Sequence, residues 1–128
     1  MPNVLVVDDT GSIRLLIRTN LELAGFDVEE AVDGESCLEH LRRIDRLPDA
    51  ITVDVMMPRL DGVATVTQIR RDARFDDIAI VMVTTQNHPS DIQRANEAGV
   101  DDYVIKPFDP DALVTTVQQA IEARRARS

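Results

Sequence analysis

The chain has 128 residues, 44% of them hydrophobic, and its 23 acidic and 14 basic residues give a formal charge of −9 at pH 7. This length and composition suit one compact domain with its own buried core and leave no room for a second. The negative charge argues against direct binding to nucleic acid or to an anionic membrane, because phosphate groups repel it.

Thiol content and hydropathy indicate the cellular compartment. Cys37 is the one cysteine in the chain, so no intramolecular disulfide can form, and a reducing cytoplasm is the expected setting. No apolar run approaches the length of a membrane span or of the core of a signal peptide. We therefore expect a cytoplasmic protein that neither crosses nor binds a membrane.

The first half of the chain alternates short apolar runs with segments of helical periodicity. Residues 3–7, 27–31 and 51–53 are the expected strands, the second more exposed than the others. Between them, Gly25 marks the end of one helix and Asp33 the start of the next. The residues expected to face the core are, in the first helix, Ile13, Leu16, Ile17, Leu21 and Ala24, and in the second, Cys37, Leu38, Leu41 and Ile44.

The second half repeats this alternation. Residues 80–83 and 103–105 are the expected fourth and fifth strands, and Asp61 and Asp109 begin the third and fifth helices. The fourth helix, over residues 89–98, has few apolar residues and is expected to be weakly buried. The residues of these helices expected to face the core are, in order, Val63, Val66 and Ile69; Ile92, Ala95 and Ala98; and Leu113, Val114, Val117 and Ile121.

Strands that alternate with helices predict an α/β fold with a parallel sheet, because each crossover helix returns the chain to the same edge by a right-handed connection. Helices must cover both faces, so the sheet is doubly wound and its strand order reverses at one point, where ligands bind in such folds. With strands numbered along the chain, 2-1-3-4-5 is the economical order. We assign residues 1–123 to this domain and the basic segment 124–128 to a frayed end or the start of a linker.

Polar residues follow the apolar runs at the points where the strands end. Asp8 and Asp9 follow the first run, Asp54 the third, Thr84 the fourth and Lys106 the fifth. Because parallel strands end at the same edge of the sheet, we expect these side chains to share one crevice. Three carboxylates in one site need a compensating cation, and oxygen ligands without nearby His or Cys favour Mg²⁺.

Phosphoryl transfer is the chemistry that this set of residues supports. Asp54 is the only well-placed nucleophile, Mg²⁺ and Lys106 would neutralise phosphoryl oxygens, and Thr84 would donate to a further oxygen. Lys106 is the one lysine among 14 basic residues, the others being arginine, which indicates a specific role for an ammonium group at this position.

These residues resemble the receiver domain of two-component response regulators, a family that includes single-domain chemotaxis regulators. The resemblance covers nearly the whole chain, in order and at the family's spacing. It implies a flavodoxin-like fold of five strand–helix units and a phosphoprotein of phosphorelay signal transduction, rather than an enzyme with independent substrate turnover. The motifs that carry it are Val6-Val7-Asp8-Asp9, Asp54 before Met57-Pro58 and Asp61-Gly62, Val83-Thr84-Thr85, and Tyr103 through Lys106-Pro107-Phe108.

The resemblance implies a role for each residue of the expected site. Asp54 matches the phosphoacceptor, which receives a phosphoryl group from a phosphohistidine on a sensor histidine kinase or a histidine phosphotransfer protein. Mg²⁺ would be held by Asp9, Asp54 and the backbone carbonyl of Met56, and by Asp8 through water. Lys106 matches the lysine that contacts the phosphoryl group.

The resemblance also implies how the signal leaves the site. Thr84 matches the switch hydroxyl that moves toward the phosphoryl group, and Tyr103 the aromatic residue that rotates inward with it. The helix after Thr84, the strand at Tyr103 and the last helix would form the face that binds a downstream target protein. The bond between Lys106 and Pro107 is expected to be cis.

Three positions depart from the pattern of many relatives. Met56 stands where many relatives have a polar residue, and Gln86 follows Thr84 by two residues; we expect both to tune the lifetime of the phosphoryl group. Thr85 is bulkier than the alanine common in relatives and is expected to restrict access. The thioethers of Met56 and Met57 are expected to serve packing, because sulfur is no ligand for a hard ion.

Other classes of protein fit less well. An aspartate-nucleophile hydrolase would need a second Asp where Met56 stands. No GxGxxG or GxxxxGK[ST] loop follows a strand, and the phosphate-binding first loop of a flavin carrier would be repelled by Asp8 and Asp9. Two alternatives stay open: a receiver-like interaction module that works without phosphorylation, and a receiver cut from a longer regulator with a DNA-binding output.

Overall fold

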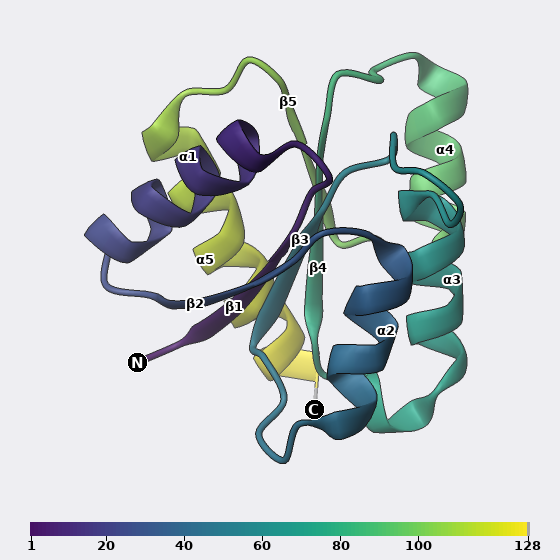
Figure 1. The fold of residues 1–128 in the computed structure, drawn as a ribbon, viewed down its shortest axis with the longest axis horizontal. Coiled ribbons are helices and arrows are strands. Elements are labelled where there is room, and N and C mark those ends of the chain that lie inside the picture. The colour runs from purple at the N-terminus through teal and green to yellow at the C-terminus, as the bar shows by residue number, and fades with distance from the viewer. Residues whose placement is uncertain (128) are drawn as a thin grey trace.

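The computed structural model describes residues 1–127, and within them five parallel strands form one sheet (Figure 1). The strand order is β2-β1-β3-β4-β5, which confirms the order predicted from the sequence. Because the order reverses between β1 and β3, the crevice at their carboxyl ends is the place for a ligand. The strands are β1 (Asn3–Val7), β2 (Asp27–Ala31), β3 (Ala50–Val53), β4 (Ala79–Thr84) and β5 (Asp102–Ile105).

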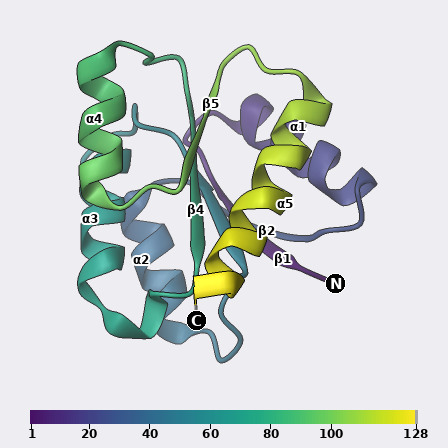
Figure 2. The ribbon, with the colours of Figure 1, turned by 180° about the vertical axis from the view of Figure 1, so that it is seen from behind.

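Helices cover both faces of the sheet, as the doubly wound fold requires. In two opposite views, α1 and α5 lie on one side and α2, α3 and α4 on the other (Figures 1 and 2). Within residues 1–127, none of the helices is long and apolar enough to cross a membrane. They are α1 (Gly11–Leu23), α2 (Gly34–Arg43), α3 (Gly62–Arg71), the short 3-10 helix η1 (Ala73–Phe75), α4 (Pro89–Ala98) and α5 (Pro110–Arg127).

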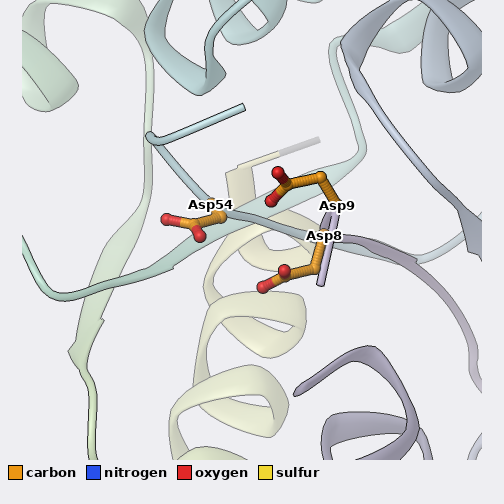
Figure 3. Close-up of side chains that lie close together, drawn as sticks. All are labelled: Asp8, Asp9 and Asp54. Carbon is orange, nitrogen blue, oxygen red and sulfur yellow. The ribbon is translucent and has the colours of Figure 1, made fainter. Parts of the chain in front are cut away.

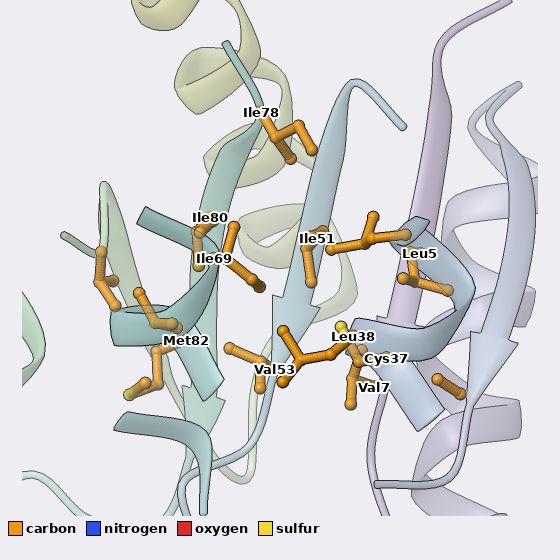
Figure 4. Close-up of a cluster of buried hydrophobic side chains, with 14 of the residues drawn as sticks. Leu5, Val7, Cys37, Leu38, Ile51, Val53, Ile69, Ile78, Ile80 and Met82 are labelled. Carbon is orange, nitrogen blue, oxygen red and sulfur yellow. The ribbon is translucent and has the colours of Figure 1, made fainter. Parts of the chain in front are cut away.

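Each face of the sheet has its own hydrophobic cluster, because successive side chains of a strand point to opposite faces. Leu5 and Val7 pack with residues of α2 and α3, in the cluster that Figure 4 shows, whereas Val4 and Val6 pack with α1 and α5. Every residue of β1, β3 and β4 is buried. The centre of the sheet is therefore closely packed on both sides, and it holds the strand ends in fixed positions.

Side-chain caps fix the starts of α2 and α3 near the carboxyl edge of the sheet. Asp33 accepts a hydrogen bond from the backbone N–H of Ser36 at 2.8 Å, and the Ser36 hydroxyl accepts one from Asp33 in return, which forms a capping box for α2. Asp61 caps α3 in a similar way. At the other ends, Gly25 and Gly99 have positive φ angles of 95° and 110°, which glycine adopts without strain.

The buried core differs from the predicted core at two places, on α1 and in the loop that follows β3. Leu16 is 47% exposed and Ala24 lies exposed after the last turn, so the buried stripe of α1 is narrower than predicted and consists of Ile17 and Leu21. α1 lies against β1 and β2 at one end of the sheet and beside α5, so only the side of α1 that is turned to these elements is covered (Figure 1). Met56 is 60% exposed, so the packing role expected for its side chain was wrong.

The basic segment at the end of the chain is helical rather than frayed. α5 continues to Arg127, and Arg124 donates hydrogen bonds to Asp101 at 2.8 Å and to the carbonyl oxygen of Asp76 at 2.9 Å. Because these partners are distant in sequence, the local composition did not reveal them. The last residue of the predicted segment, Ser128, lies outside the described residues.

Candidate functional site

Two neighbouring strands deliver the acidic residues to one edge of the sheet. β1 and β3 pair in parallel with Val7 opposite Val53, and the backbone N–H of Asp54 donates to the carbonyl oxygen of Val7 at 3.3 Å. The residues after each strand therefore leave the sheet side by side. Figure 3 shows the carboxylates of Asp8, Asp9 and Asp54 gathered at this edge.

The three carboxylates form one cluster of oxygen atoms. One oxygen from each of Asp8, Asp9 and Asp54 lies within 4.8 Å of the others. Asp8 and Asp54 are buried, with 1% and 7% of their surface exposed, whereas Asp9 is exposed to solvent. Carboxylate oxygens with one solvent-facing side suit a hard divalent ion that keeps part of its hydration shell, so this donor set fits Mg²⁺.

Lys106 brings a positive charge into contact with two of these carboxylates. Its Nζ lies 2.9 Å from Oδ2 of Asp8 and 2.9 Å from Oδ2 of Asp54. Burial lowers the pKa of Lys106, but the hydrogen bonds to the two carboxylates outweigh it, and the net shift of the pKa is upward. The lysine is therefore charged at neutral pH and bridges the two carboxylates. The bond between Lys106 and Pro107 is cis, which confirms that expectation.

Backbone donors orient the same two carboxylates. Oδ1 of Asp8 accepts from the N–H of Thr10 at 2.9 Å, and Oδ1 of Asp54 accepts from the N–H of Met56 at 3.3 Å. Arg14, from α1, donates to the carbonyl oxygen of Asp8 at 2.8 Å. Each buried carboxylate thus has one oxygen held by the loop after its strand and the other held by the lysine.

Thr84 and Tyr103 lie on neighbouring strands and share a partner, Gln86. The hydroxyl oxygen of Thr84 accepts from the N–H of Gln86 at 3.3 Å, and the hydroxyl of Tyr103 donates to the carbonyl oxygen of Gln86. Thr84 also accepts, through its carbonyl oxygen, from the N–H of Lys106 at 2.9 Å. The structure therefore places Thr84 beside the lysine, with its hydroxyl bonded to Gln86 rather than to a carboxylate.

An open pocket of about 600 Å³ adjoins Asp54. Two of the three positions expected to depart from the family pattern, Met56 and Gln86, contact each other beside it, with Nε2 of Gln86 2.8 Å from Sδ of Met56. Arg94 of α4 also reaches the pocket, which the sequence did not reveal, since an isolated arginine on an exposed helix carries no local signal. The pocket is lined by Asp9, Thr10, Asp54, Val55, Met56, Met57, Pro58, Asp61, Gln86 and Arg94.

Comparison with known sequences places this arrangement in a family. The response regulator receiver domain family matches residues 4–118. The DNA-binding dual master transcriptional regulator RpaA of Synechocystis is 37% identical over 118 residues, which are 92% of this chain and 48% of that protein. The sensor histidine kinase CheAY of Helicobacter pylori is 34% identical over 119 residues, 93% of this chain and 15% of that protein. The chain thus spans about half the length of the regulator and a small part of the kinase.

Solved structures give the same result for the fold. The chemotaxis protein CheY4 of Vibrio cholerae superimposes with a TM-score of 0.87 at 34% identity, over 94% of this chain and 98% of that one. A putative response regulator from Chloroflexus aurantiacus superimposes with a TM-score of 0.89 at 32% identity, over 95% of this chain and 99% of that one. The sheet order and the helices on both of its faces are therefore shared with proteins of this type.

Proposed function

The chain belongs to the family of response regulator receiver domains, which are signalling domains of two-component systems, and we propose that it is the phosphoacceptor switch of a phosphorelay. It would accept a phosphoryl group on Asp54 from a sensor histidine kinase or a histidine phosphotransfer protein. The observation that carries this proposal is the position of Lys106, whose Nζ lies 2.9 Å from both Asp54 and Asp8.

The transfer step uses Asp54 as the nucleophile. A carboxylate oxygen of Asp54 attacks the phosphorus of the phosphohistidine, the P–N bond breaks, and the imidazole nitrogen keeps the electron pair. The donor leaves as a neutral imidazole when its other nitrogen carries a proton, and Asp54 becomes an acyl phosphate. Lys106 holds Asp54 in place before the attack, and its ammonium group neutralises charge on the transferred oxygens.

A divalent ion would complete the compensation of charge. Asp9, Asp54 and the backbone carbonyl of Met56 would hold Mg²⁺ directly, and Asp8 would reach it through water. Bound there, the ion neutralises and orients phosphoryl oxygens. Support for this assignment comes from the cluster of carboxylate oxygens within 4.8 Å and from the solvent-facing side at Asp9.

Thr84, Gln86 and Tyr103 would transmit phosphorylation to the surface. The phosphoryl group adds negative charge and acceptor oxygens close to the Thr84 hydroxyl. As Thr84 turns to donate to them, it leaves the N–H of Gln86, whose carbonyl oxygen holds the hydroxyl of Tyr103. Tyr103 then rotates inward, and the face of α4, β5 and α5 shifts toward the state that binds a downstream target protein.

The proposed function also covers the turnover, the partners, the location and the bounds of the domain. The domain would assist its own phosphorylation and dephosphorylation without independent substrate turnover. The charge of −9 disfavours direct binding of this domain to nucleic acid, and the single cysteine, which is buried, agrees with a cytoplasmic location. We propose residues 1–123 as the receiver unit.

A receiver within a longer DNA-binding regulator is the second candidate arrangement. RpaA and the transcriptional regulatory protein PrrA of Mycobacterium leprae, which is 38% identical, are about twice as long as the segment they share with this chain. In that arrangement the basic segment that begins at residue 124 would lead into a linker and an output domain.

The direct test is the intact mass of the protein after incubation with a small phosphodonor such as phosphoramidate, with and without Mg²⁺. We expect the wild type to gain one phosphoryl group in the presence of Mg²⁺ and Asp54→Asn to gain none. Asp27→Asn is the matched control, because Asp27 pairs with Asn3 at the opposite edge of the sheet. It should be labelled as the wild type is.

The alternative outcomes separate the candidate functions. A gain that survives Asp54→Asn would contradict the assignment of the phosphoacceptor. No gain in folded wild-type protein would favour the interaction module that works without phosphorylation. A gain in this domain fits both a receiver that acts alone and a receiver within a longer regulator. The second arrangement is tested on a protein that also carries the DNA-binding segment.

A further inference from the structure

Met56 is one of two exposed sulfur-bearing side chains in the part of the chain that the structure describes. Met56 is 60% exposed and Met1 74%, whereas Met57 is 9% exposed and Met82 and Cys37 are fully buried. Burial raises the pKa of Cys37 to about 12, so its thiol is protonated as well as inaccessible at neutral pH. An oxidant in solution therefore meets sulfur at Met56 and Met1.

The two exposed methionines lie in different surroundings. Met56 lines the pocket that adjoins Asp54, and its N–H donates to Oδ1 of Asp54 at 3.3 Å. Met1 lines a separate pocket with Gly25 and Phe26, at the end of α1. A chemical change at Met56 therefore alters the surroundings of the phosphoacceptor, and the same change at Met1 does not.

The sulfur of Met56 also touches the residue that links the two switch residues. Its Sδ lies 2.8 Å from Nε2 of Gln86, whose N–H donates to Thr84 and whose carbonyl oxygen accepts from Tyr103. A thioether is a weak acceptor, so the Gln86 amide has a weak partner at this position. A stronger acceptor on the sulfur would hold that amide more firmly.

We propose that Met56 is a site of reversible oxidation by peroxide and that its sulfoxide shortens the lifetime of the phosphoryl group on Asp54. The second half of this statement rests on the proposed function. A lone pair of the sulfur attacks one oxygen of hydrogen peroxide, the S–O bond forms as the O–O bond breaks, and the other oxygen leaves as water after proton transfer. The sulfur loses two electrons and the peroxide gains them.

The sulfoxide differs from the thioether in polarity and in hydrogen bonding. Its oxygen is a strong acceptor, whereas the thioether presents an apolar group to the pocket. The new oxygen binds both the Gln86 amide and water, and so it holds water closer to the acyl phosphate of Asp54. We expect hydrolysis of the acyl phosphate to become about threefold faster or more, which corresponds to a modest fall in its barrier.

The first experiment maps the oxidation by mass spectrometry of peptides after brief exposure to dilute hydrogen peroxide. Met56 and Met1 should each gain one oxygen, while Met57 and Met82 stay unmodified until the protein is unfolded in urea. Oxidation of Met56 at the slow rate of Met57 and Met82 would overturn the proposed site.

The second experiment measures the half-life of the phosphoryl group after peroxide has been removed, in the wild type and in Met56→Leu. This variant keeps Met1 and the backbone carbonyl at position 56, and each protein is compared with its own untreated sample. Oxidation should shorten the half-life of the wild type and leave that of Met56→Leu unchanged. A methionine sulfoxide reductase supplied with a dithiol should restore the wild type, because the dithiol is oxidised to a disulfide and the sulfoxide oxygen leaves as water.

The outcomes of the two experiments are distinguishable. The proposed effect on Asp54 would be overturned if oxidation left the half-life of the wild type equal or longer. It would also be overturned if oxidation shortened the half-life of Met56→Leu as much as that of the wild type. Untreated wild type that accepts no phosphoryl group would contradict the proposed function itself, and with it the effect on Asp54. The peptide map would still decide whether Met56 is the site of oxidation.

Discussion

The Nζ of Lys106 lies 2.9 Å from Oδ2 of Asp54, although the two residues are 52 positions apart in the chain. This contact joins the ends of β3 and β5, which lie on either side of β4 in the sheet. The same ammonium group contacts Asp8. It therefore offsets the electrostatic repulsion between two buried carboxylates.

Removal of this ammonium group should destabilise the protein in the absence of Mg²⁺. Lys106→Met keeps the side-chain length but leaves Asp8 and Asp54 without their buried partner, so we expect the free energy of unfolding to fall by about 2 kcal/mol. Mg²⁺ should restore part of the loss, because it compensates the same carboxylates. Urea denaturation with and without Mg²⁺ measures both effects.

The matched control for that experiment is Arg71→Met, which removes a basic residue from the exposed surface of α3. Its free energy of unfolding should stay within about 0.5 kcal/mol of the wild type. A Lys106→Met protein as stable as this control, with no response to Mg²⁺, would show that the lysine does not compensate the carboxylates.

Gly62 should be required for the position of Asp54. A Cβ atom at Gly62 would overlap the backbone carbonyl oxygen of Asp54, so Gly62→Ala must displace the loop that follows β3. We expect this variant to lose about 2 kcal/mol of stability and to accept a phosphoryl group more slowly. At Gly11 the nearest atom is the guanidinium nitrogen of Arg14 at 3.7 Å, and Gly11→Ala should be as stable as the wild type or more. Equal stability of the two variants would contradict the expected overlap.

Thr52 should be less favourable than valine at its position in β3. Thr52 is 1% exposed, and its hydroxyl has no hydrogen-bond partner among the described residues. The native state therefore carries the cost of burying a polar group. We expect Thr52→Val to raise the free energy of unfolding by about 1 kcal/mol and the melting temperature by a few degrees. Thermal and urea denaturation measure the change.

Thr65 is the control for this substitution, because it is fully buried and its hydroxyl donates to the carbonyl oxygen of Asp61 at 2.8 Å. Thr65→Val removes a satisfied hydrogen bond and should be destabilising by about 1 kcal/mol. Opposite signs for the two threonine substitutions are the expected result. A loss of stability in Thr52→Val would mean that the Thr52 hydroxyl of the wild type has a hydrogen-bond partner.

The sequence predicted the candidate site because one physical rule connects residues that are distant in the chain. Strands of a parallel sheet end at the same edge, so Asp8, Asp54 and Lys106 could be brought together from the ends of three apolar runs. The single lysine strengthened that prediction because its chemistry differs from that of the arginines.

Side-chain contacts between loops and helices could not be predicted in this way. The contact of Met56 with Gln86, the reach of Arg94 into the pocket and the pairing of Arg124 with Asp101 depend on how separate elements are placed, and no local pattern encodes them. Leu16 shows the same limit, since its spacing along α1 fits a buried stripe but its side chain is 47% exposed once the helix is placed against the sheet.

The cap of α2 should make stability depend on pH at the acid end. Hydrogen bonds from the backbone and hydroxyl of Ser36, and then the pairing with Arg59 at 2.6 Å, hold the pKa of Asp33 below its ordinary value of 3.8. A carboxyl with a lowered folded-state pKa contributes stability that is present above the unfolded pKa and is lost as pH falls through the folded pKa.

Asp33→Asn keeps a capping side chain without the charge. Urea denaturation should therefore show the wild type to be more stable than Asp33→Asn at pH 6, with a difference that shrinks below pH 4. A difference that is constant, or that grows as pH falls, would contradict this assignment.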